Sequence, residues 1–147
     1  MSGKRFSKRL FESNDELARE TVEYLRDFFG VDSWEDSESR YTIDRVGHRN
    51  GQPVLYVEVE IKQHWKDGHE VFPYPDVNLP ERKEKYFDLD LPTYFVIFSA
   101  DCRGAVIFSD RVVKKCPKVE VPNRYVRSGE LFFKIPVGHA SFTQINK

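Results

Sequence analysis

The chain has 147 residues and a formal net charge of -1, from 23 lysines and arginines against 24 aspartates and glutamates. This near-neutral balance argues against non-specific coating of DNA, so any nucleic-acid surface must be a local patch. The length suits one domain over residues 1–147, with its core at about 13–109 and a C-terminal extension at 110–147.

No apolar run is long enough to span a bilayer, and the polar, basic start MSGKR lacks the apolar stretch of a signal peptide. Without a secretory signal, Cys102 and Cys116 are interpreted as free thiols in a reducing compartment. We therefore expect a cytoplasmic protein with no membrane partner.

The first predicted element is a helix that begins at Ser13 and ends at Gly30. Ser13 and Glu16 have the spacing of a capping box, apolar residues recur with a period of 3.6, and glycine suits a left-handed helix end. Of the acids beside the apolar stripe, Glu20 lies nearest its aromatic border and is expected to face a site. Residues 1–12 are basic and favour a solvated terminus over an arm that contacts phosphate.

A β-hairpin is predicted next. Residues 31–39 form an acidic loop or contain a short edge strand, and strands follow at 40–47 and 54–65. The Asn-Gly pair between these strands is a strong hairpin signal.

The second hairpin strand alternates cleanly, so its side chains divide between two faces. One face carries Leu55, Val57, Val59 and Ile61, and the other carries Tyr56, Glu58, Glu60 and Lys62. A tight two-residue turn places Asp44 opposite Val57, whereas a longer loop or a bulge brings Asp44 level with Glu60. The pattern leaves this register open.

The remaining chain predicts a mixed fold. A loop at 66–77 precedes a helix from about 78 to 88, and the apolar run at 93–99 is typical of a strand buried on both faces in a parallel sheet. Further strands are expected at 105–109 and about 131–135. The fold class is therefore α/β, with a mixed central sheet flanked by helices.

Glu60-Ile61-Lys62 places a carboxylate and an ammonium side by side on one face of a strand, with Asp44 sixteen residues upstream across a turn. Two carboxylates can hold a divalent metal, and a lysine can orient or activate water beside a phosphate. The alternative without a catalytic site is that these residues form the solvent-facing side of an antiparallel sheet, where Lys62 pairs with a side chain on a neighbouring strand.

Taken in order, the helix with Glu20, the strand with Asp44, the strand ending in Glu60-Ile61-Lys62, and the following helix and buried strand resemble the PD-(D/E)XK nuclease superfamily. The resemblance covers residues 13–109 and implies a restriction-endonuclease-like or resolvase-like core. Ile43 stands where the motif has its proline. Only one clear strand precedes Glu60, where the family core usually has two.

The resemblance implies a metal-dependent endonuclease that hydrolyses phosphodiester bonds in DNA, with branched or nicked DNA among the candidate substrates. Asp44, Glu60 and the Ile61 carbonyl would bind Mg²⁺ or Mn²⁺, Lys62 would act on the water or the phosphate, and Glu20 would hold a second metal or its water. The DNA backbone would be contacted by the basic residues of the second helix, Arg82, Lys83 and Lys85. No small-molecule cofactor is expected.

Such enzymes often act as homodimers, and the small size suggests a phage or mobile-element protein in the cytoplasm of a bacterium or infected host. Two other functions remain open. One is a catalytically silent nucleic-acid-binding module on the same fold, and the other is a phage protein-binding or structural factor.

Overall fold

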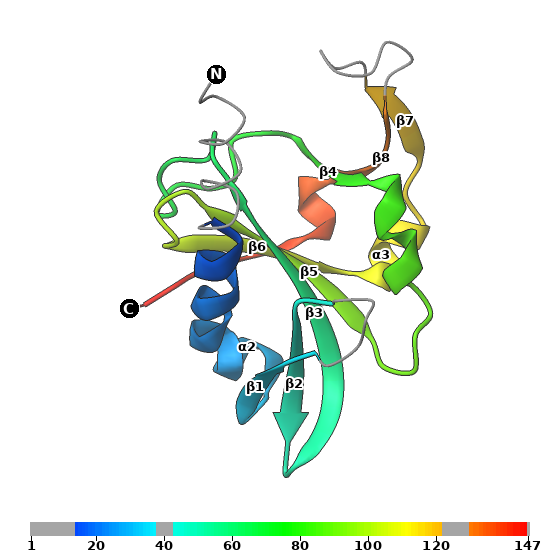
Figure 1. The fold of residues 1–147 in the computed structure, drawn as a ribbon. Coiled ribbons are helices and arrows are strands. Elements are labelled where there is room, and N and C mark those ends of the chain that lie inside the picture. The colour runs from blue at the N-terminus through cyan, green and yellow to red at the C-terminus, as the bar shows by residue number, and fades with distance from the viewer. Residues whose placement is uncertain (1–13, 38–42, 122–129, 147) are drawn as a thin grey trace, which may run out of the picture.

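The computed structural model describes residues 14–37, 43–121 and 130–146 (Figure 1). These residues form a six-stranded sheet of order β1-β2-β3-β5-β6-β9 and a three-stranded sheet of order β4-β8-β7. The strands are β1 (Ser33–Asp36), β2 (Arg45–Arg49), β3 (Gln52–Lys62), β4 (Asp76–Pro80), β5 (Thr93–Ser99), β6 (Gly104–Ser109), β7 (Lys118–Val121), β8 (Glu130–Pro136) and β9 (Ser141–Gln144). The helical elements are η1 (Val22–Leu25), α2 (Arg26–Phe29), η2 (Glu81–Tyr86), α3 (Asp110–Lys114) and η3 (Val137–His139), and residues 14–21 are also α-helical.

The larger sheet is mixed, because β3 and β5 are parallel while the other neighbouring strands are antiparallel. The N-terminal helical segment covers one face, and the smaller sheet with η2 and α3 lies over the other (Figure 1). An α/β fold with a mixed sheet is thus confirmed. A sheet, in addition to helices, covers the second face.

Each face of the large sheet packs against its own hydrophobic cluster. Alternate residues of β5 divide between them: Val96 and Phe98 join the cluster beneath the N-terminal helix, and Phe95 and Ile97 join the cluster shared with the smaller sheet. Nearly every residue of β5 is buried, as expected for a strand covered on both faces.

The N-terminal helix follows its predicted pattern. Its apolar stripe (Ala18, Val22, Leu25 and Phe29) is buried, and Gly30 ends the helix with φ at 65°. The predicted cap at Ser13 lies outside the described residues. The acidic segment that follows contains the edge strand β1, which pairs with β2, so two strands precede β3.

The hairpin predicted at Asn-Gly is confirmed, and its turn has two residues, one of the alternatives that the sequence left open. Asn50 and Gly51 have positive φ of 54° and 77°, and Arg49 pairs directly with Gln52. Beyond the turn the ladder shifts by one residue between Gly47 and His48. This bulge sets the register of the site described below.

The structure corrects several predicted boundaries. Asn78–Pro80 belongs to strand β4, not to a helix, because it pairs with β8. The predicted helix is the shorter 3₁₀ segment η2. The C-terminal segment is not peripheral: β7 and β8 complete the smaller sheet, and β9 pairs with β6.

Among the described residues, no helix combines the length and the apolar character needed to cross a membrane. Both cysteines are free thiols, with Cys102 buried and Cys116 partly buried.

Candidate active site

Three carboxylates from β3 and the residue preceding β2 face one open hollow of about 410 Å³ on the large sheet. We call it the acid hollow. Its lining includes Asp44, Glu58, Glu60, Ile61, Arg82 and Lys83. The predicted first acid, second acid and carbonyl donor therefore lie together, joined by an acid that the motif comparison did not select.

The register explains why Asp44 meets Glu58. Arg45, the first residue of β2, pairs with Val57 of β3. Asp44, which precedes β2, therefore lies level with Glu58. The bulge adds one residue to the spacing of a tight hairpin, enough to move Asp44 from Val57 to Glu58 but not to Glu60. Neither register proposed from the sequence is the observed one.

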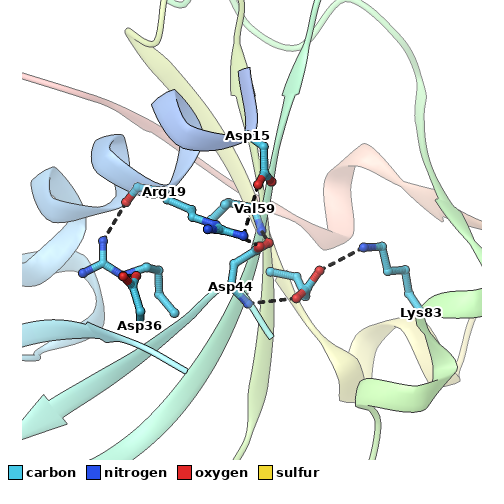
Figure 2. Close-up of polar contacts among 8 residues, drawn as sticks. Asp15, Arg19, Asp36, Asp44, Val59 and Lys83 are labelled. Carbon is cyan, nitrogen blue, oxygen red and sulfur yellow. Dashed lines mark hydrogen bonds and ion pairs between the residues drawn. The ribbon is translucent and has the colours of Figure 1, made fainter. Parts of the chain in front are cut away.

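Asp44 is held by its neighbours on both strands and by the helix (Figure 2). Its Oδ2 accepts a hydrogen bond from the Val59 backbone N–H at 2.9 Å, and its Oδ1 lies 3.5 Å from Arg19 Nε. Burial raises the pKa of Asp44, and nearby Asp15 raises it further, while the Val59 hydrogen bond, Arg19 and Lys83 oppose this rise.

Glu58 is the most buried carboxylate of the hollow, with 6% of its surface exposed. Its Oε1 accepts from the Asp44 backbone N–H at 3.0 Å and its Oε2 from Lys83 Nζ at 2.9 Å. Burial, followed by the charge of Asp44, raises the pKa of Glu58 to about 7 despite Lys83. Burial alone would lower the pKa of Lys83, but the charge and hydrogen bond of Glu58 raise it overall.

Glu60 lies where three hollows meet. It lines the acid hollow, a small pocket under Lys83, and a separate hollow of about 460 Å³ that also contains Lys62. Although Glu60 is exposed as a residue, atoms crowd its carboxylate, so burial raises its pKa, and Lys62, Lys83 and Arg82 oppose the rise. Lys62 Nζ lies 5.8 Å from the centre of the Tyr74 ring.

The predicted pair Glu60 and Lys62 is therefore adjacent, as strand alternation requires. Lys62, however, lines the second hollow and not the acid hollow. The cations that face Asp44 and Glu58 are Arg19 and Lys83.

The N-terminal helix contributes Asp15 and Arg19 to the acid hollow. These two side chains are paired at 3.1 Å and lie one turn apart. Glu20 is exposed and is not among the residues that line the hollow. Because Glu20 comes five positions after Asp15, the two side chains point about 140° apart around the helix axis.

The basic residues of η2 divide between sites. Arg82 and Lys83 line the acid hollow, and Arg82 also pairs with Glu130 at 3.2 Å. Lys85 lies over the Tyr86 ring at 5.0 Å and lines a different, larger hollow. The predicted basic surface is thus partly neutralised by acids of this chain.

The donor chemistry of the acid hollow fits a hard divalent cation. Carboxylate side chains with raised pKa values line this hollow, and Ile61 lines the same space. As the side chains lie, however, residues 14–37, 43–121 and 130–146 contain no three acidic, histidine or cysteine side chains arranged to enclose a metal ion. Arg19 and Lys83 occupy the carboxylates instead, so loading a cation requires these pairs to open.

Two residues of the acid hollow, Glu58 and Asp15, are not part of the family motif, although the sequence pattern indicates where each side chain lies. Glu58 shares the polar face of β3 with Glu60, and Asp15 has the i,i+4 spacing to Arg19. Their positions in the acid hollow depend on the register of β2 against β3 and on the rotation of the helix about its axis.

Comparison of the chain with protein-family models and with curated proteins found no match.

Proposed function

We propose that this protein is a metal-dependent endonuclease that hydrolyses phosphodiester bonds in DNA, on a restriction-endonuclease-like core of the PD-(D/E)XK type. One observation carries the proposal: Asp44, Glu58 and Glu60 line one open hollow together with three basic side chains, Arg19, Arg82 and Lys83. Strand β1 supports it, because it supplies the second strand expected ahead of Glu60.

Asp44 and Glu60, with the Ile61 carbonyl, are the proposed ligands of Mg²⁺ or Mn²⁺. The cation, when bound, supplies Lewis-acid polarisation of the phosphate and lowers the pKa of a water. Glu58 positions Asp44 through its backbone N–H and holds Lys83 beside the hollow. Lys62 approaches from the adjoining hollow and offers its ammonium to charge developing on phosphate oxygens.

Arg82 and Lys83 are the proposed contacts to the DNA backbone at the acid hollow, and Lys85 extends that surface. Glu20, which the resemblance had assigned a metal role, has no part in this scheme because it does not line the hollow. Among the acids of the helix, Asp15 comes nearest to that role, because its charge raises the pKa of Asp44.

The test is nicking of supercoiled plasmid with Mn²⁺ or Mg²⁺, compared with EDTA. Asp44→Asn and Glu60→Gln should abolish nicking, and Lys62→Ala should reduce its rate by about 10²–10³-fold if it stabilises phosphate charge. Titration calorimetry with Mn²⁺ alone should show binding that Asp44→Asn and Glu60→Gln remove and Lys62→Ala retains.

Glu20→Gln is the matched control. Glu20 is an exposed acid on the N-terminal helix, but other residues of that helix, not Glu20, line the acid hollow. This variant should nick at the wild-type rate. Metal-dependent nicking that survives Asp44→Asn would show contamination or another site, and would end the assignment.

A second function is favoured by a specific observation. Asp44 and Glu58 are already bonded to Arg19, Lys83 and backbone N–H groups. Because these basic side chains already pair with the carboxylates, the hollow also suits a nucleic-acid-binding module that has no catalytic activity. DNA retardation without Mn²⁺ binding or nicking would establish that alternative, and the absence of both would favour the protein-binding factor.

A further inference from the structure

A second hollow, of about 640 Å³ and so larger than the acid hollow, lies at the other end of β3. We call it the aromatic hollow. It lies between the β2–β3 hairpin, η2 and the segment that leads from η2 to β5, and its volume falls in the range of small-ligand pockets. Its walls include Ile43, Val46, Tyr56, Tyr86 and Leu89.

Carboxylates and a histidine lie among these apolar walls. Glu35 and Asp36 come from β1 and are largely exposed, at 66% and 79% of their side-chain surface. Asp90 accepts a hydrogen bond from the Tyr56 hydroxyl at 2.8 Å. His48 Nε2 lies 3.6 Å from Glu35, while its Nδ1 is buried without a hydrogen-bond partner.

This chemistry selects the kind of group that enters. Asp36 is paired with Arg45 at 3.1 Å. Glu35 and Asp90 are therefore the carboxylates set against the lining ammonium of Lys85, so the hollow offers a phosphate no net attraction. A flat, neutral ring gains from apolar and aromatic walls, and carboxylate oxygens accept hydrogen bonds from exocyclic amino groups, as they do from cytosine N4. Each carboxylate has acceptor positions beyond the one its present partner uses.

The aromatic hollow adjoins the acid hollow. Tyr86 lines both, and Tyr56, Glu58, Glu60 and Lys62 follow one another along the same face of β3. At a rise of about 3.3 Å per residue, Tyr56 lies roughly 13 Å from Glu60. A single strand that crosses the acid hollow can therefore place a nearby base in the aromatic hollow.

We propose that the aromatic hollow accepts an unpaired nucleobase with an exocyclic amino group, belonging to the strand whose backbone lies at the acid hollow. This inference rests on the proposed function and narrows its substrate to DNA with a single-stranded or splayed segment. A paired base presents neither its face nor its full edge to such a hollow.

Binding is measured by fluorescence anisotropy in EDTA, with fluorescein-labelled single-stranded dC, dA and dT oligonucleotides and a blunt duplex. The dC and dA strands should bind about tenfold more tightly than dT, because dT lacks an amino donor. The duplex should bind more weakly than dC.

Two leucines of nearly equal exposure provide a matched pair. Leu89 is 40% exposed and lines the aromatic hollow, whereas Leu17 is 38% exposed and lies on the N-terminal helix, outside the linings of the aromatic and acid hollows. Leu89→Glu should weaken dC binding on the order of tenfold, and Leu17→Glu by less than about twofold. Glu35→Gln should narrow the dC preference over dT, because its amide can donate to thymine O4.

Three results would each overturn the base site: equal affinity for dC and dT, equal losses in Leu89→Glu and Leu17→Glu, or duplex binding as tight as that of dC. Plasmid nicking by the same preparations separates the two proposals. Nicking without base preference overturns only the base site, while base preference without nicking or Mn²⁺ binding overturns only the hydrolysis. Circular dichroism verifies that every variant is folded.

Discussion

At the scale of single residues, Asp44 and Glu58 show how burial sets the charge of the site. Each accepts a backbone N–H from the other strand, so the pair joins β3 to the start of β2 as well as lining the hollow. Burial raises both pKa values, and a neighbouring carboxylate adds to each rise: Asp15 to that of Asp44, and Asp44 to that of Glu58. The carboxylates are thus less stable as anions here than in water, which is the condition that a bound cation would relieve.

Stability should depend on pH through Glu58. Its pKa is raised from 4.5 to about 7 on folding, so the folded state is favoured while the group is protonated. The contribution is complete below about pH 4.5 and is lost as the pH rises to about 7. Urea denaturation between these values should show the free energy of unfolding falling, and Glu58→Gln should reduce that fall by roughly 1–3 kcal/mol.

Glu120→Gln, an exposed substitution on β7, is the control and should retain the wild-type pH dependence. Gln at position 58 resembles the protonated carboxyl beside Lys83, so the stability of Glu58→Gln relative to wild type should rise between about pH 4.5 and pH 7. Identical pH dependence in Glu58→Gln and wild type would show that another group titrates in this window.

At the scale of elements, the bulge in the β2–β3 hairpin determines which acids meet. Gly47 lies at this bulge and pairs with Trp34 of the neighbouring strand β1. A Cβ added there would lie 2.9 Å from Val31 Cγ1, 3.0 Å from Leu55 Cδ1 and 3.1 Å from Trp34 Cζ3. The glycine therefore permits close packing of the element that positions Asp44.

Gly47→Ala should destabilise the protein by about 1–3 kcal/mol, because the crowded side chains must move. Gly138→Ala is the comparison, since a Cβ at Gly138 meets nothing within 4 Å, and it should change stability by less than about 0.5 kcal/mol. Urea midpoints of the two variants measure the difference. Equal midpoints would show that the packing around Gly47 relaxes without cost.

At the scale of the whole molecule, two hydrophobic clusters share the strands of one sheet. One tryptophan reports on each: Trp34 belongs to the cluster beneath the N-terminal helix, and Trp65 to the cluster shared with the smaller sheet. Because β3, β5 and β6 contribute to both clusters, we expect them to unfold together.

Single-tryptophan variants test this cooperativity. In Trp65→Phe and in Trp34→Phe, the remaining tryptophan's fluorescence should change at the same urea concentration as the far-ultraviolet circular dichroism. Ile135→Ala, a fully buried change in the second cluster, should cost about 2–5 kcal/mol and shift both transitions equally. A Trp34 transition that ignores Ile135→Ala would show two independently folding parts.

Much of the fold follows from local pattern. The alternation of β3, the Asn-Gly turn, the helix stripe ending at Gly30 and the doubly buried β5 are all written in short stretches of sequence. These features depend on local backbone geometry and on which face of an element is apolar, and neither property depends on residues far away in the chain. The same alternation correctly placed Glu60 and Lys62 on one face.

The composition of the site depended on tertiary structure. A one-residue bulge paired Asp44 with Glu58, and the rotation of the packed helix turned Asp15 and Arg19, not Glu20, toward the acids. Pairing with β8 also made a strand of Asn78–Pro80. The periodicity of a strand or helix says which residues share a face, but only packing between segments distant in the chain decides the register and orientation in which those faces meet.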